Sequence, residues 1–189
     1  MSNLFQPGYL PAQTLAGHSF TGQTAMAGVT ALPVATATGQ VFGLWNPLGS
    51  GVEVLLLGLD MGIATAGTPV VSAFCLSWLA NAGSQVGTSS PITAFTAGTP
   101  TNLRLGLGGA SRVKFTPSAA TMTAPVFLKS LGLSFESATA QNGFQWAHAD
   151  FNGSITIPPG NFVGVCGSTI QGTTALQISL DWLELPYSG

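Results

Sequence analysis

The sequence predicts an all-β protein: a jelly-roll-like β-sandwich of residues 40–189 that follows an extended N-terminal arm of residues 1–39. Three observations favour this fold class. Short apolar segments are separated by clusters of Gly, Pro, Asn and Ser, as between the strands of a sandwich. Glycine and β-branched residues interrupt every stretch with helical periodicity. No fixed period of about 20–50 residues repeats along the chain, which argues against a solenoid or a propeller.

The arm differs from the rest of the chain because it contains no charged side chain and no sustained period. We expect its apolar side chains to bind a neighbouring subunit or the sandwich itself; the alternative is an unattached leader. We expect deletion of residues 2–35 to leave the sandwich folded. The arm does not have the pattern of a secretory signal. Its apolar side chains are Leu4, Phe5, Tyr9, Leu10, Leu15, Phe20 and Met26.

The predicted strands follow the arm in order, and each ends at a turn signal. They span residues 40–45, 52–61, 70–80, 103–107, 112–116, 126–135, 144–151, 154–157, 162–166 and 176–185. Residues 83–102, rich in Ser, Thr and Gly, are predicted to be a loop. No helix is expected.

Two of these strands have informative patterns. In the segment 52–61, Val52, Val54 and Leu56 share one face, and because the other face is also mostly apolar, we expect cover on both sides. In the last strand, Leu176, Ile178, Leu180, Trp182 and Glu184 share one face.

The chain is poor in charge. Of its 189 residues, four are basic and six are acidic, whereas about a quarter of an average domain is charged. Hydrophobic residues make up 46%. Charge-driven disorder is therefore disfavoured, and four basic side chains are too few to bind a nucleic-acid backbone. Either part of the surface is buried against copies or partners, or uncharged polar residues solvate it. The apolar runs are too short to span a membrane as helices.

Residues with catalytic potential are few. Asp150 lies two positions after His148, so in a strand both side chains point to one face. This pair either orients an imidazole or is a surface pair. Asp181 and Glu184 lie on opposite faces, which argues against paired catalytic carboxylates. No cluster has metal-ligand spacing and no glycine-rich stretch has the phosphate-loop pattern, so we expect no catalytic, metal or cofactor site.

The two cysteines, Cys75 and Cys166, lie in apolar, strand-like segments. We interpret them as buried free thiols, because a disulfide would need an oxidising compartment that nothing in the sequence indicates.

All four basic residues fall within positions 104–129. They are Arg104, Arg112, Lys114 and Lys129. Two interpretations stay open: a basic patch that docks on an acidic partner, or solvated charges on strand edges, where they discourage aggregation.

Three segments together resemble structural proteins of tailed bacteriophages. They are residues 44–56 (LWNPLGSGVEVLL), 155–165 (ITIPPGNFVGV) and 180–186 (LDWLELP). The family is similar in having an aromatic residue before an Asn-Pro-x-Gly-Ser-Gly turn and a hydrophobic strand. It is also similar in a late strand, Pro-Gly turn and strand, and in a terminal Trp-x-Glu-x-Pro.

The resemblance implies a capsid decoration, or cement, protein: a jelly-roll homotrimer on the surface of the phage head, made in the host cytoplasm. The implied partners are other copies of the chain and the major capsid protein. The family offers no catalytic motif to carry over. The alternative is a carbohydrate- or receptor-binding module of a phage fibre or spike, in which Trp146 or Tyr187 stacks on a sugar.

Overall fold

Alternation of apolar and polar residues produces strands along most of the chain that the structure describes. The computed structural model describes residues 8–26, 39–65, 73–80, 92–122, 126–134, 146–167 and 175–187. Its helix is α1 (Tyr9–Leu15). Its strands are β1 (Ser19–Gln23), β2 (Gly39–Asn46), β3 (Val52–Thr65), β4 (Ala73–Ala80), β5 (Ile92–Phe95), β6 (Thr101–Asn102), β7 (Lys114–Met122), β8 (Val126–Ser134), β9 (Trp146–Ile157), β10 (Asn161–Gly167) and β11 (Ala175–Pro186).

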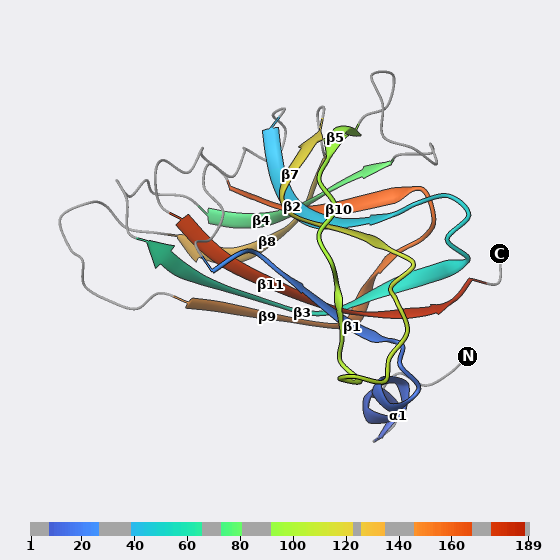
Figure 1. Ribbon diagram of the computed structural model, residues 1–189. Coiled ribbons are helices and arrows are strands. Elements are labelled where there is room, and N and C mark those ends of the chain that lie inside the picture. The colour runs from blue at the N-terminus through green and yellow to red at the C-terminus, as the bar shows by residue number, and fades with distance from the viewer. Residues whose placement is uncertain are drawn as a thin grey trace.

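The strands pair as one long antiparallel hairpin that is rolled up (Figure 1). β1 pairs with β11, β2 with β10, β3 with β9 and β4 with β8. Pairing of β11 with β3 and of β10 with β4 closes the roll into two sheets. Their strand orders are β6-β1-β11-β3-β9 and β5-β7-β2-β10-β4-β8. Eight strands in this arrangement form a jelly roll, so the predicted all-β, jelly-roll-like sandwich is confirmed.

The hydrophobic core lies between the two sheets. Trp182 of β11 and Phe115 of β7 stack across it, with their ring centroids 6.4 Å apart. The predicted face of the last strand is confirmed, since its alternate side chains are buried in this core or at its end. Those side chains are Leu176, Ile178, Leu180, Trp182 and Glu184.

Both sheets also bury side chains on their outer faces. Leu55 of β3 and Leu183 of β11 lie opposite each other and are buried on the side away from the core. The expected cover on both faces of β3 is therefore confirmed at Leu55, whereas the side chain of Asp60, farther along the outer face, is 43% exposed. On the six-stranded sheet, Phe162 lies opposite Trp45 and is fully buried. A Cβ at Gly164 would come within 2.7 Å of the Phe162 ring, so this packing requires a glycine there.

Irregular pairing changes which side chains enter the core. The pairing of β3 with β9 shifts between Leu56 and Gly58. The buried series of β3 therefore changes phase and continues at Leu59 and Met61. Opposite this shift, β9 has left-handed backbone at Asn152, with φ at 48°. The two strands predicted at residues 144–151 and 154–157 are consequently one bulged strand.

Several local predictions were wrong. Residues 83–102 were expected to be a loop, but they contain β5 and β6, which extend the sheets at their edges. Residues 103–107 form turns instead of a strand, and Gly106 there has a φ of 77°. The next strand begins at Lys114 instead of Arg112.

The arm also differs from its prediction. It contains the helix α1, although no helix was expected. It also contains β1, which pairs with both β11 and β6. This part of residues 1–39 is thus a strand of the sandwich, and the expected boundary at residue 40 does not separate it from the sheet.

Candidate interaction surface

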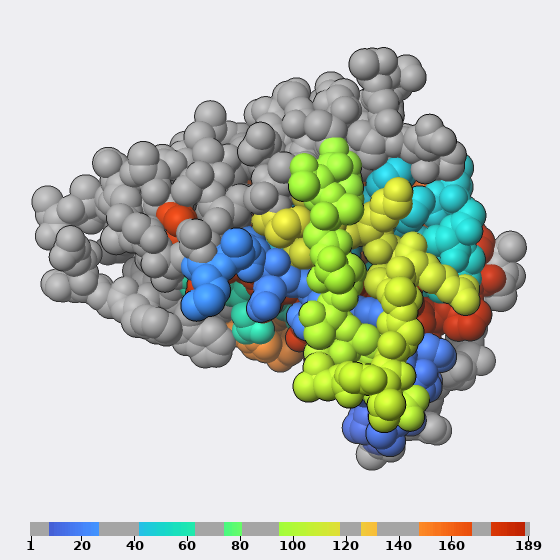
Figure 2. Space-filling view, viewed as in Figure 1, coloured from blue at the N-terminus to red at the C-terminus, as the bar shows by residue number. Residues whose placement is uncertain are grey.

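Five exposed leucines lie on two adjoining segments at one end of the sandwich, and we call them the apolar tip. Leu105 and Leu107 are each 75% exposed and Leu15 is 70% exposed. Figures 1 and 2 show the connection between β6 and β7 lying against α1 at the bottom of the molecule. Arg104 is the single charged residue in the segments 8–17 and 102–111 that build this end. The tip consists of Leu10 and Leu15 from α1 and of Leu103, Leu105 and Leu107 from the connection.

Asn102 holds the connection in a defined shape. Its Nδ2 donates hydrogen bonds to the carbonyl oxygens of Gly17, at 2.8 Å, and Gly109, at 3.1 Å. Its Oδ1 accepts a hydrogen bond of 2.9 Å from the backbone N–H of Arg104. A Cβ at Gly108 would overlap the Asn102 carboxamide, so the close approach requires glycine. Leu103, Leu105 and Leu107 are therefore presented by a loop that is already ordered, which lowers the entropy cost of binding.

The helix α1 is attached to the sandwich by polar contacts and buries none of its own side chains. The hydroxyl groups of Thr14 and Ser19 lie 2.9 Å apart, and Gln13 Oε1 lies 2.8 Å from His18 Nδ1. A seven-residue helix is marginal in water without an apolar face to bury. Its exposed leucines are therefore suited to packing against another surface.

The arm residues that were predicted to bind a partner differ in their exposure. Leu10 and Leu15 are exposed and belong to the apolar tip, and Tyr9 is partly exposed. Phe20 is in the core, where it stacks on Trp182 with a centroid distance of 6.0 Å, so it is not available to a partner. Leu4 and Phe5 lie outside the described residues.

Leu103, Leu105 and Leu107 were missed as surface residues. Their alternation with Arg104 and Gly106 is the pattern of a strand, so the sequence predicts one there. A usable signal was Gly106, because glycine between the leucines weakens a strand and, with its φ of 77°, it forms part of the turn.

The four basic residues are all exposed but do not form one patch. Arg104 and Arg112 lie in the connection between β6 and β7, and Lys114 begins β7, where its Nζ lies 5.2 Å from the centre of the Trp45 ring. Lys129 is on β8, and three strands separate β8 from β7. Its Nζ lies 5.5 Å from the Phe151 ring. Two of the four charges are thus placed over aromatic rings, which stabilises them locally.

A histidine bracketed by carboxylates lies on the outer face of the five-stranded sheet. His148 Nδ1 is 2.7 Å from Asp60 Oδ1, and its Nε2 is 3.0 Å from Asp150 Oδ1. The predicted pairing of His148 with Asp150 on one strand face is confirmed, and Asp60 is a second partner that no local sequence pattern indicates. The contacts with Asp60 and Asp150 raise the pKa of His148. Because both ring nitrogens face a carboxylate, this arrangement suits a bound imidazolium better than a general base.

Asp181 of β11 lies near this group. Burial raises the pKa of the Asp181 carboxyl, a hydrogen bond with Thr21 opposes the shift, and the charge of Asp60 adds to it. Among the described side chains, no group of three or more His, Cys, Asp and Glu is arranged to hold a metal ion.

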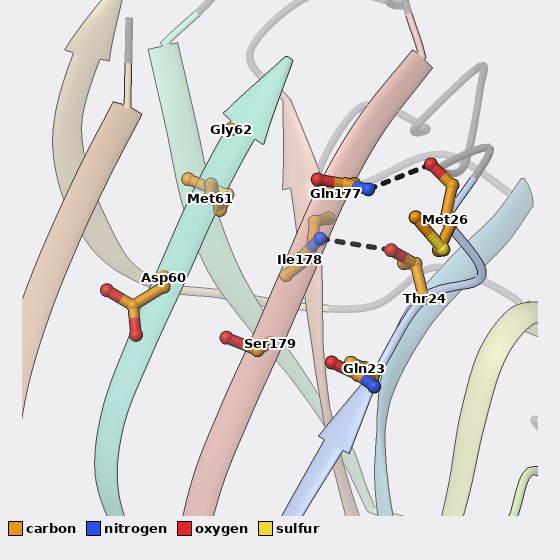
Figure 3. A pocket seen from close by; sticks show the side chains of 9 residues that line it. All are labelled: Gln23, Thr24, Met26, Asp60, Met61, Gly62, Gln177, Ile178 and Ser179. Atoms are coloured by element: carbon orange, nitrogen blue, oxygen red, sulfur yellow. Dashed lines mark hydrogen bonds between the residues drawn. The ribbon is translucent and has the colours of Figure 1, made fainter. Parts of the chain in front are cut away.

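An open hollow of about 320 Å³ lies beside Asp60, between the ends of β1, β11 and β3 (Figure 3). Gln177 Nε2 donates to the Met26 carbonyl at 2.8 Å, and the Ile178 N–H donates to Thr24 Oγ1 at 3.1 Å. Amide, hydroxyl and carboxylate groups line it together with the Met26 side chain, and none of the described lining residues is aromatic.

Glu184 has a structural role at the end of the core. Its Oε1 accepts hydrogen bonds from Ser111 Oγ at 2.5 Å and Trp182 Nε1 at 3.1 Å. Its Oε2 accepts one of 2.9 Å from the Arg112 N–H. The buried carboxylate thus ties the connection between β6 and β7 to β11.

Within the described ranges, no helix has the length and apolar character needed to cross a membrane. Comparison with known proteins identified no matching family model, no similar curated protein and no similar solved structure.

Proposed function

We propose that this chain is a non-enzymatic structural protein of a phage virion, which decorates or cements the capsid surface as a homo-oligomer, most simply a trimer. The observation that carries the proposal is the apolar tip: preformed, rich in leucine and almost without charge. The interiors of protein interfaces are likewise depleted of charge. The jelly roll supports the proposal, since viral capsid proteins use it, although this fold also serves other functions.

A comparison of the free energy of burying the tip with the free-energy cost of association favours several tips acting together. The tip exposes roughly the equivalent of three leucine side chains, so its burial would contribute about 4–9 kcal/mol. Association costs an estimated ~4–15 kcal/mol in lost freedom of motion. A single tip therefore gives weak binding at best. A trimer that presents three tips to a symmetric shell gains avidity from their linkage.

The test is a double variant of the tip, Leu105→Glu with Leu107→Glu. Leu48→Glu is the matched control, because Leu48 is 46% exposed but lies in the turn between β2 and β3. We expect the tip variant to bind particles stripped of the native protein at least about thirtyfold more weakly, because two leucines lose their burial.

The control variant should bind as the unaltered chain does. Light scattering of both variants separates loss of self-association from loss of particle binding. Equal particle binding by the tip variant and the control would contradict the proposal.

A carbohydrate- or receptor-binding module remains the second candidate, because the hollow beside Asp60 combines polar groups with Met26. Against it, none of the described lining residues supplies an aromatic ring on which a sugar stacks. The Trp146 side chain lies outside what the structure describes, and Tyr187, which is exposed, follows β11 beside Gly51. Glycan-array binding that is lost in Gln177→Ala, but kept in the tip variant, would favour this second candidate.

A further inference from the structure

Cys75 of β4 and Cys166 of β10 face each other in the middle of the six-stranded sheet. They are directly opposite in the antiparallel pair, and their Sγ atoms are 3.3 Å apart. Both are buried free thiols, as the sequence predicted. Because the neighbouring Phe74 and Leu76 point into the core, the two thiols lie on the other face of the sheet.

This geometry is close to that of a disulfide. A bridge forms without backbone movement when the two Cα atoms are about 4.4–6.8 Å apart. Opposite residues of an antiparallel pair have Cα atoms about 4.5 or 5.5 Å apart. The two sulfurs are ~1.3 Å farther apart than a bonded pair, a gap that rotation of the side chains closes. We propose that Cys75 and Cys166 form an intramolecular disulfide when the folded protein meets an oxidant such as a peroxide.

The chemistry is a two-electron oxidation of the thiol pair. The neighbouring Cys166 thiol lowers the pKa of Cys75, whereas the pKa of Cys166 is raised, so Cys75 supplies the thiolate. It attacks one oxygen of hydrogen peroxide, the O–O bond breaks, and Cys75 becomes a sulfenic acid. The released hydroxide takes up a proton and leaves as water. The Cys166 sulfur then attacks the sulfenic sulfur, the S–O bond breaks, and a second water leaves with the Cys166 proton.

The bridge would join two strands that are far apart in sequence. It closes a loop of 91 residues, which contains β5 to β9, and ties β4 to β10 inside the sheet. A loop of this length restricts the unfolded chain strongly. The bridge would be absent in a reducing compartment and would form after transfer to an oxidising one. This inference does not depend on the proposed function, because it concerns the isolated chain.

The first test compares the reduced full-length protein with the same protein treated with hydrogen peroxide. Each sample is unfolded in urea that contains iodoacetamide, which alkylates the free thiols, and is then analysed by peptide mass spectrometry. We expect a Cys75–Cys166 cross-linked peptide after peroxide, and two alkylated cysteines without it. The oxidised protein should melt roughly 10 °C higher than the reduced protein. The same treatment should leave the melting temperature of Cys166→Ala unchanged.

A second measurement removes the effect of limited access to the buried thiols. The chain is refolded from urea in a glutathione redox buffer, so that both thiols are exposed before the fold forms. We expect the intramolecular bridge to predominate over mixed disulfides with glutathione. Cysteines recovered as alkylated thiols, as sulfinic acids, as glutathione adducts or as links between chains would overturn the proposal.

Discussion

Trp182 shows how a single side chain joins distant parts of this fold. Its ring lies near Phe20 of β1 on its own sheet and near Phe115 of β7 on the other, and its Nε1 donates to Glu184. The residue is fully buried. Its removal would therefore leave both a cavity and a buried carboxylate that lacks one donor.

We expect Trp182→Ala to lower the free energy of unfolding by about 3–5 kcal/mol, measured by urea denaturation. Tyr187→Ala is the matched control, because Tyr187 is 46% exposed, and its effect should stay within about 0.5 kcal/mol. A loss of less than ~1 kcal/mol for Trp182→Ala would show that the core does not depend on this ring.

The titration of His148 makes the stability of the fold depend on pH in a definite direction. Its pKa is raised above 6.5, first by Asp60 and then by Asp150. A raised pKa in the folded state means that the imidazolium stabilises the fold at pH values below about 6.5. This contribution is lost as the pH rises through the raised value. The pKa of Asp181 is also raised, chiefly by burial, and the charge of Asp60 adds to the shift.

We expect the ring protons of His148, followed by NMR, to titrate at a higher pH than an unperturbed histidine. Asp60→Asn should lower this midpoint, because it removes the larger of the two causes. As the pH rises from about 6.5 through the raised pKa of His148, the melting temperature of the unaltered chain should fall relative to that of His148→Gln. If Asp60→Asn leaves the titration midpoint of His148 unchanged, Asp60 is not a cause of the raised pKa.

At the scale of elements, α1 and β1 are adjacent in sequence but differ in what they contribute. α1 buries no side chain, whereas β1 pairs with β11 over five residues and buries Phe20 against Trp182. Because β1 lies within residues 2–35, the structure argues against the expectation that these residues can be removed without an effect on folding.

Two deletions separate these contributions. Removal of residues 2–16 should leave the melting temperature nearly unchanged and weaken particle binding, because only the α1 part of the tip is lost. Removal of residues 2–35 should destabilise the sandwich by about 3–5 kcal/mol, because the core loses Phe20 and β11 loses a neighbour. Equal thermal stability of the two truncated chains would contradict the assignment of β1 to the sandwich.

At the scale of the whole molecule, the pairing of the strands determines which segments of the chain lie together at the surface. The first strands pair with the last, so nearly every contact between sheet neighbours joins residues distant in sequence. The same arrangement brings α1, near the N-terminus, against the connection between β6 and β7. The apolar tip therefore results from the topology, because its two segments are far apart in the sequence.

The sequence by itself determined that the chain is a charge-poor β protein and which side chains of β11 turn inward. These properties follow from local periodicity, since a strand alternates its faces every residue. Only the tertiary structure decided which strands are neighbours, that the leucines at 103–107 form a turn, and that Asp60 meets His148 and Cys75 meets Cys166. Periodicity specifies the face that a side chain takes but not the strand beside it, and that choice depends on packing between residues far apart in sequence.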